Sequence, residues 1–122
     1  MKNIEFNIIV NSNDSDFSIR LATECDKYGF LLSFIDKYED FIKFDYDESY
    51  ISVIILDIND SDENKFELCK KIRTHHEIPV FAVMDKLNTK LRSRAKKHGF
   101  DLIISKKMFL SSIREVIIHV SK

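Results

Sequence analysis

Two charged side chains that follow apolar runs are the residues of this sequence best placed to do chemistry. Asp57 comes directly after residues 53–56, and Lys106 follows residues 102–104 with one serine between. If both runs are strands of one parallel sheet, their carboxyl ends meet at the edge where such sheets carry functional residues. An opposite charge within about 4 to 6 Å favours the charged form of a carboxyl group. We therefore expect Asp57 and Lys106 to form an ion pair.

Five short segments have the composition of strands. Four are continuous aliphatic runs, as in strands that are buried on both faces of a parallel sheet, at residues 8–10, 53–56, 80–83 and 102–104. The fifth, residues 31–35, is more mixed and suits a strand near the sheet edge. The positions just after the four runs, where function is expected, are Asn11, Ser12 and Asn13; Asp57; Met84 and Asp85; and Ser105, Lys106 and Lys107.

Segments with helical spacing separate these runs. Apolar residues recur every three or four positions in residues 17–28, 66–72, 87–95 and 113–120, and a weaker pattern covers residues 38–44. The only two glycines, Gly29 and Gly99, each follow such a pattern, where a left-handed glycine ends a helix at no steric cost. The alternation predicts an α/β fold, a five-stranded parallel sheet with helices on both faces, in a single domain over residues 1–122.

Residue types exclude several classes of site. Two glycines at helix ends cannot supply the Gly-rich loop of a dinucleotide or nucleoside triphosphate site. A phosphate loop in residues 11–15 is disfavoured because Asp14 and Asp16 would repel a phosphate. There is no nucleophile elbow, zinc pair or His-Glu helical motif, and Cys25 and Cys69 lack metal-ligand spacing. We therefore predict no enzymatic activity and no cofactor, with a small catalytic domain of flavodoxin-like fold as the least favoured alternative.

Charge is distributed unevenly along the chain. The net charge is −1, but residues 1–61 hold 5 Lys/Arg against 13 Asp/Glu, and residues 62–122 hold 14 against 7. Opposite halves attract each other in a compact fold or present separate charged faces. No stretch approaches the roughly 18 consecutive apolar residues of a membrane-spanning helix. The first residues lack the apolar block of a signal peptide, so a cytoplasmic protein is expected.

The sequence resembles the receiver domains of bacterial response regulators over its whole length. The resemblance rests on residues 53–58, the helical pattern of residues 66–73, residues 78–80 before the fourth strand and residues 105–107 after the fifth. It implies a flavodoxin-like (βα)5 receiver fold in a two-component, phosphorelay-type signalling protein. It also implies that Asp57 is the phosphoacceptor position and that Lys106 pairs with the phosphorylated site. The carbonyl of Asn59 would lie where the family holds a metal ion.

The pocket departs from the family pattern after the first strand. The family places two acidic residues there to hold Mg²⁺, and this sequence has Asn11 and Ser12. Mg²⁺ favours anionic oxygen ligands and neutralises the charge that builds up during phosphoryl transfer. Asp14 lies two positions further on, from where it could reach the site through water, but capping the next helix is the favoured role. Weak or no Mg²⁺ binding is therefore expected at Asp57 and Asn59.

Further departures affect the switch that couples phosphorylation to output. Met84 stands where the family has a Ser or Thr hydroxyl that binds the phosphoryl oxygen, and Ile103 where it often has a Tyr or Phe. Lys65 stands where a glycine is usual after the third strand. This turn is expected to be rebuilt, with Asn64 in the left-handed position.

These departures lead to two main functional hypotheses. The first is a pseudo-receiver, a protein–protein interaction module that kept the scaffold and has impaired Mg²⁺-dependent phosphorylation. The second is a working phosphoprotein that receives a phosphoryl group on Asp57 from a histidine kinase, because both Asp57 and Lys106 are retained. We favour the first.

A basic segment indicates the kind of partner. Residues 86–98 contain six Lys/Arg and no acidic residue, and they are predicted to form the fourth helix. Its predicted core-facing residues are Leu87, Leu91 and Ala95, and its predicted outer residues are Lys86, Lys90, Arg94 and Lys97. In receiver domains this helix belongs to the usual output face, which suggests a signalling partner such as a histidine kinase or an acidic effector. Nucleic acid is disfavoured and no membrane is expected. Self-association with the acidic residues 36–48 of another copy is the rival explanation, and a solvated helix is the plain one.

Overall fold

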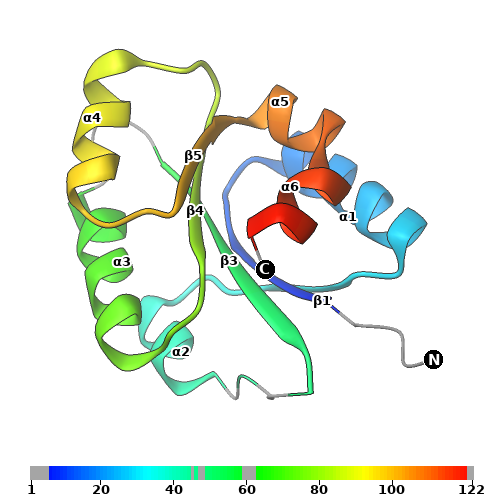
Figure 1. Ribbon diagram of the computed structural model, residues 1–122, viewed down its shortest axis with the longest axis horizontal. Coiled ribbons are helices and arrows are strands. Elements are labelled where there is room, and N and C mark those ends of the chain that lie inside the picture. Colours follow the sequence, from blue (N-terminus) through cyan, green and yellow to red (C-terminus); the bar gives the residue numbers. More distant parts are fainter. Residues whose placement is uncertain (1–5, 45, 47–48, 59–62, 121–122) are drawn as a thin grey trace.

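The computed structural model describes residues 6–44, 46, 49–58 and 63–120, and in these ranges strands and helices alternate along the chain (Figure 1). The strands are β1 (Phe6–Asn11), β2 (Leu31–Phe34), β3 (Ile51–Asp57), β4 (Val80–Met84) and β5 (Leu102–Ser105). The helices are α1 (Ser15–Tyr28), α2 (Tyr38–Lys43), α3 (Glu63–His75), α4 (Thr89–Lys97), α5 (Lys106–Ser111) and α6 (Ile113–Val120).

The strands form one parallel sheet in the order β2-β1-β3-β4-β5. The predicted fold class is therefore confirmed, and β2 lies at the sheet edge as its mixed composition indicated. The chain order reverses direction between β1 and β3, so the carboxyl ends of these two strands flank the topological switch point. Asp57 is the last residue of β3, and Asn11 is the last residue of β1.

Helices cover both faces of the sheet and create two cores. α1, α5 and α6 lie on one side and α2, α3 and α4 on the other (Figure 1). Neighbouring strand residues contribute to opposite cores: Ile54 and Leu56 pack toward the α3 side, and Val53 and Ile55 pack toward the α1 side. This two-sided burial explains why the strands read as continuous aliphatic runs. Within the described ranges, no helix is both long and apolar enough to cross a membrane.

The predicted helix ends are present at three positions. Asp14 is the N-cap of α1, and its Oδ1 accepts a hydrogen bond from the backbone N–H of Phe17 at 3.1 Å. Gly29 and Gly99 have φ angles of 70° and 89°, the left-handed conformation that favours glycine. Of these ends, the Asp14 cap follows β1 and lies at the carboxyl end of the sheet, where the candidate site is found, whereas Gly29 and Gly99 precede β2 and β5 at the amino end.

The prediction for the fourth helix was wrong at its start. α4 begins at Thr89, because the side-chain oxygen of Asn88 accepts hydrogen bonds from the N–H groups of Lys90 and Leu91 at 2.9 and 3.2 Å. Leu87 precedes this cap and its side chain is 52% exposed, so it does not face the core as predicted. Leu91 and Ala95 are buried, as predicted.

One helix was not predicted, and one other local prediction was wrong. Lys106 begins a helix of its own, α5, because the Ser105 hydroxyl accepts a hydrogen bond from the N–H of Met108 at 3.2 Å and caps it. Asn64 is helical, and among the described residues only glycines have positive φ. The turn after β3 therefore does not use Asn64 in a left-handed conformation.

Candidate functional site

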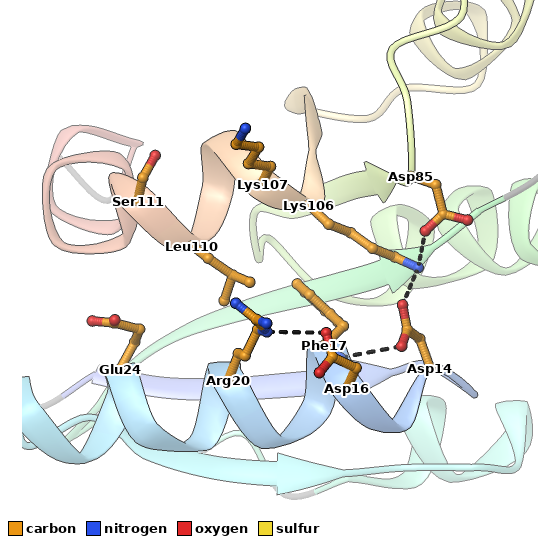
Figure 2. Close-up of a pocket in the computed structure, with 10 residues that line it drawn as sticks. All are labelled: Asp14, Asp16, Phe17, Arg20, Glu24, Asp85, Lys106, Lys107, Leu110 and Ser111. Carbon is orange, nitrogen blue, oxygen red and sulfur yellow. Dashed lines mark hydrogen bonds and ion pairs between the residues drawn. The ribbon is translucent and has the colours of Figure 1, made fainter.

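The ammonium group of Lys106 is the centre of the site. Its Nζ lies 2.9 Å from Oδ2 of Asp57, which confirms the expected ion pair. The same Nζ lies 3.0 Å from Oδ2 of Asp14 and 2.8 Å from Oδ1 of Asp85 (Figure 2). Two more carboxylates therefore share the lysine that pairs with Asp57.

Each carboxylate of this cluster comes from a different element. Asp57 ends β3, Asp14 caps α1, and Asp85 directly follows β4. Lys106 opens α5, and its side chain passes over Phe17, with Nζ 5.6 Å from the ring centroid. The Lys106 side chain is only 11% exposed and Asp57 is 14% exposed, whereas Asp85 is 84% exposed. The Asp57 contact is therefore the shielded part of the cluster, and the Asp85 contact is open to solvent.

Burial and ion pairing act in opposite directions on Lys106. Burial lowers the pKa of its ammonium, but the hydrogen bonds that it donates to the three carboxylates outweigh burial and raise the pKa above its usual value. For Asp14 the pKa is lowered, chiefly by the hydrogen bond from Lys106 and then by the one from the N–H of Phe17. Both shifts favour the charged forms of Lys106 and Asp14 at neutral pH.

Asn11, the last residue of β1, and Ser12, the next residue, hydrogen-bond within the protein. The Ser12 hydroxyl donates a hydrogen bond to Oδ2 of Asp57 at 2.6 Å, the same oxygen that Lys106 contacts. The Asn11 amide donates to the carbonyl oxygens of Ile35 and Asp36 at 2.7 and 3.3 Å. Asn11 thus fastens the end of β1 to the segment after β2, while Ser12 orients the Asp57 carboxylate.

This donor set does not fit Mg²⁺ well. Mg²⁺ needs near-octahedral oxygen coordination and dehydrates reluctantly, so it favours carboxylates. Here Oδ2 of Asp57 already accepts two hydrogen bonds, and the neighbouring Asp14 and Asp85 carboxylates bind an ammonium. Among the described residues, no group of three or more His, Cys, Asp or Glu side chains is arranged to hold a metal ion. Asn59, predicted to offer its carbonyl, lies outside the described residues.

The predicted switch positions face the core on the α3 side. Met84 is buried there, and Ile103 is partly buried against the same cluster. Neither side chain carries a hydrogen-bonding hydroxyl. Lys65, on α3, donates a hydrogen bond from Nζ to the backbone carbonyl of Asp57. A second ammonium thus lies at the end of β3, where the sequence indicated only a rebuilt turn.

Three contacts of the site were not predicted from the sequence. Asp14 was expected mainly to cap α1 and to reach the site only through water. Asp85 was noted only for its place after β4, and Lys65 was noted only for replacing a glycine. One signal could have indicated Asp85: it directly follows a strand that neighbours β5, so its carboxylate is carried to the same edge as Lys106. The rotamers that bring Asp14 and Lys65 into contact leave no pattern in the sequence.

An open groove of about 460 Å³ runs from the cluster between α1 and α5 (Figure 2). Its walls carry charges of both signs, and Arg20 pairs with Asp16 across one turn of α1 at 3.0 Å. The residues that line it are Asp14, Asp16, Phe17, Arg20, Glu24, Asp85, Lys106, Lys107, Leu110 and Ser111.

The basic helix α4 lies away from this cluster, on the other side of the sheet (Figure 1). Lys86, Lys90 and Lys97 are exposed, as predicted. Arg94 is not spread over the outside, because its guanidinium lies 4.4 Å from the ring centroid of Phe66 and is only partly exposed. This stacking anchors α4 to α3.

Comparisons with known proteins agree with this architecture. No family model matches the sequence, and neither does any curated protein. Among solved structures, a CheY-like protein (tadZ) from Pseudomonas aeruginosa matches with a TM-score of 0.80 and 14% identity, over 93% of this chain and 98% of that one. A response regulator from Thermotoga maritima matches with a TM-score of 0.79 and 17% identity, over 97% and 98%. A putative pilus assembly protein (cpaE) from Burkholderia thailandensis matches with a TM-score of 0.73 and 14% identity, over 95% and 98%.

At these identities the likeness is one of fold. The chain has the flavodoxin-like fold of a response-regulator receiver domain, as its sequence predicted.

We expect Lys106→Met to destabilise the protein by about 2 kcal/mol, because it leaves the shielded Asp57 carboxylate without its counter-ion. Adding Asp57→Asn to Lys106→Met should restore part of the lost stability, with a coupling energy of about 1 kcal/mol between the two positions. Urea unfolding of both single variants and the double variant measures this. Lys107→Met, at an exposed neighbour, is the matched control and should change stability by less than about 0.5 kcal/mol. Strict additivity of the two single effects would contradict the coupling.

The pH dependence of stability should report the Asp14 contact. Because the pKa of Asp14 is lowered in the folded protein, its contribution is present above its ordinary pKa of 3.8 and is lost as pH falls through the lowered value. Asp14→Asn keeps an N-cap side chain and removes the charge. The variant should be less stable than wild type at neutral pH, and the difference should vanish in acid. Unfolding measured from about pH 7 to pH 2 tests this, and in a Lys106→Met background the difference should shrink at every pH.

Proposed function

We propose that this chain is an atypical receiver domain of a two-component-type signalling protein, acting mainly as a protein–protein interaction module with impaired Mg²⁺-dependent phosphorylation. The observation that carries the proposal is the charge balance at Asp57. Its Oδ2 is held at 2.9 Å by the Lys106 ammonium and at 2.6 Å by the Ser12 hydroxyl. The two carboxylates that hold a metal ion beside this aspartate in the family pocket are replaced by Asn11 and Ser12, and the Ser12 hydroxyl binds Asp57 itself.

Electrostatics explains why a metal ion would be disfavoured. A divalent cation entering beside Asp57 would approach the Lys106 ammonium and would have to displace the Ser12 hydroxyl. Like charges at such separations repel by amounts comparable to the attraction of an ion pair. The family pocket offsets this repulsion with two more carboxylates, and Asn11 and Ser12 offer only neutral groups.

The residues at the family's two switch positions, Met84 and Ile103, support the same proposal. Met84 cannot donate a hydrogen bond to a phosphoryl oxygen. Ile103 has no aromatic ring that could change rotamer in response. Both are packed in the core on the α3 side. Even if Asp57 were phosphorylated, the chain would lack the polar contact that draws the β4–α4 loop toward a phosphoryl group.

The alternative is a functional phosphoacceptor that receives a phosphoryl group on Asp57 from a histidine kinase. The retained Asp57–Lys106 contact favours it, since a lysine at this place can neutralise a phosphoryl oxygen. The two functions differ in whether Mg²⁺ and a phosphoryl mimic bind at Asp57.

Mg²⁺ should bind at Asp57 with a dissociation constant in the millimolar range or weaker, because a single partly engaged carboxylate is a poor Mg²⁺ site. Amide NMR titration with Mg²⁺, alone and with beryllofluoride, measures this. The matched gain-of-function control is the double variant Asn11→Asp/Ser12→Asp, which restores two carboxylates and should bind Mg²⁺ at least about tenfold more tightly. Sub-millimolar affinity in the wild type, with beryllofluoride shifts around Asp57, would replace this proposal by the phosphoacceptor alternative.

The proposed interaction surface is α4. Five of its nine residues are basic, none is acidic, and the last turn carries Arg94, Lys96 and Lys97. Within the described part of the chain, the exposed Lys90, Arg92, Lys96 and Lys97 form no ion pairs. Unbalanced charge of one sign steers partners of the opposite sign. An acidic protein segment is the partner that we propose.

Lys90→Glu/Lys97→Glu should abolish binding of a fluorescent poly-glutamate peptide, because it reverses two exposed charges of α4. The matched control is Lys43→Glu, an exposed lysine at the end of α2. Binding to the wild type should weaken steeply between about 50 and 500 mM salt, as screening shortens to a few Å. A DNA duplex of equal charge serves as the competing probe. Tighter binding of the duplex, or no effect of the double variant, would refute an acidic protein partner at α4.

A further inference from the structure

Exposed apolar side chains gather on one part of the molecule, along α1 and β2. Six large hydrophobic residues of the described chain are exposed, and four of them lie on α1 or β2: Ile19, Tyr28, Leu31 and Phe34. Ile19 is 68% exposed and Phe34 is 48% exposed, which are high values for residues of their size. The other two, Leu87 and Met108, lie singly elsewhere.

In the first turns of α1 the charged residues lie on one side of the helix. Asp16, Arg20 and Glu24, spaced by four, line the groove toward α5. Ser15, Ser18 and Ile19 line a separate groove of about 530 Å³ toward β2. Ala22 is exposed one turn beyond Ile19. The sorting leaves the β2 side of the first turns of α1 without a charge.

The groove toward β2 is uncharged throughout. It is lined by Ser12, Asn13, Ser15, Ser18, Ile19 and Phe34. In a chain in which 32% of the residues are charged, six neighbouring surface residues without a charge form an unusual patch. Short hydroxyl and amide side chains surround two apolar ones, the arrangement of an apolar centre with a polar rim.

β2 adds an open sheet edge to this patch. It pairs only with β1 in the described sheet, so the backbone groups of its outer edge have no strand partner there. Its sequence, Leu-Leu-Ser-Phe, contains neither a charge nor a proline, the usual devices that keep an edge from pairing. Leu31 and Phe34, at its two ends, are both exposed.

We propose that this α1–β2 face, centred on Ile19 and Phe34, is the interface of a twofold homodimer. The proposal goes beyond the proposed function and does not rest on it. In a twofold interface each patch meets its own copy, so a surface of one charge sign repels itself and an uncharged surface does not. The exposed lysines of α4 oppose that helix as a self-contact, whereas the residues that line the groove between α1 and β2 carry no charge that opposes its own copy. The apolar centre provides the driving force, because pairing removes Ile19 and Phe34 of both copies from water.

Sedimentation equilibrium of the full chain from about 10 μM to about 1 mM should show a monomer–dimer equilibrium. Ile19→Lys should weaken the dimer by roughly a hundredfold or more, because one substitution at an interface hot spot acts twice across a twofold axis. Leu87→Lys makes the same kind of change at an exposed apolar residue outside the patch and should leave the equilibrium unchanged. Since Ile19 is exposed, Ile19→Lys should fold, and its amide NMR spectrum verifies this.

Salt distinguishes this dimer from a head-to-tail contact of opposite charges. An uncharged apolar interface should persist or tighten at about 500 mM salt, whereas a contact between charged surfaces should dissociate as screening shortens to a few Å. A monomer at all concentrations, a salt-sensitive dimer, or a dimer that tolerates Ile19→Lys would each overturn the proposal.

Cross-linking tests the twofold geometry directly. The native Cys25 and Cys69 are buried, and burial raises the pKa of both thiols to about 12, so neither should react. Ala22→Cys places a thiol on the exposed α1 face and should form an intermolecular disulfide under mild oxidation. Ser93→Cys, exposed on the basic helix α4, is the matched control and should stay monomeric. Equal cross-linking at both positions would contradict a specific α1–β2 interface.

Discussion

One buried ammonium group determines how the functional end of this molecule is arranged. Lys106 opens α5, and its three carboxylate partners lie at the end of β3, at the start of α1 and directly after β4. Figure 2 shows the contacts with Asp14 and Asp85. Removing a charge from water is costly unless it is paired. The side chain of Lys106 therefore has one good position, and the loops that carry its partners are held relative to it. The contact with Asp57 is the strongest constraint, because both groups are shielded, while the solvent-exposed Asp85 contributes little.

The same constraint gives a physical reason why this pocket would differ from a metal-dependent one. In a pocket with several carboxylates around one aspartate, the carboxylates repel one another until a divalent cation binds. Binding of the cation therefore orders such a pocket. Here the Lys106 ammonium and the Ser12 hydroxyl already stabilise Asp57, and Lys65 binds the carbonyl of the same residue. Such a site has little electrostatic free energy left to gain from a cation. This charge balance is the physical basis of the proposed pseudo-receiver function.

The sequence predicted elements better than contacts, and particular residues show why. The aliphatic runs at β1, β3, β4 and β5 predict buried parallel strands because burial on two faces removes alternation. Leu87 was misplaced because apolar periodicity extends across a cap, and only the side chain of Asn88 decides where the helix begins. The Lys106–Asp14 contact joins residues 92 positions apart, and its formation depends on rotamers that no local pattern encodes. The exposure of Ile19 was hidden for a similar reason, since a sequence shows that a residue is apolar but not whether another element covers it.

Folding also changes the meaning of the charge asymmetry along the chain. Two acidic residues of the first half, Asp14 and Asp57, form ion pairs with Lys106 of the second half. The excess base that remains in the second half is concentrated on α4, where the described residues supply no acidic partners for its exposed lysines. The surface therefore has one face, α4, whose charge favours a partner of opposite charge, and a groove between the first turns of α1 and β2 whose lining residues carry no charge. Because these two faces lie on opposite sides of the sheet (Figure 1), a partner bound at α4 would not compete with self-association through α1.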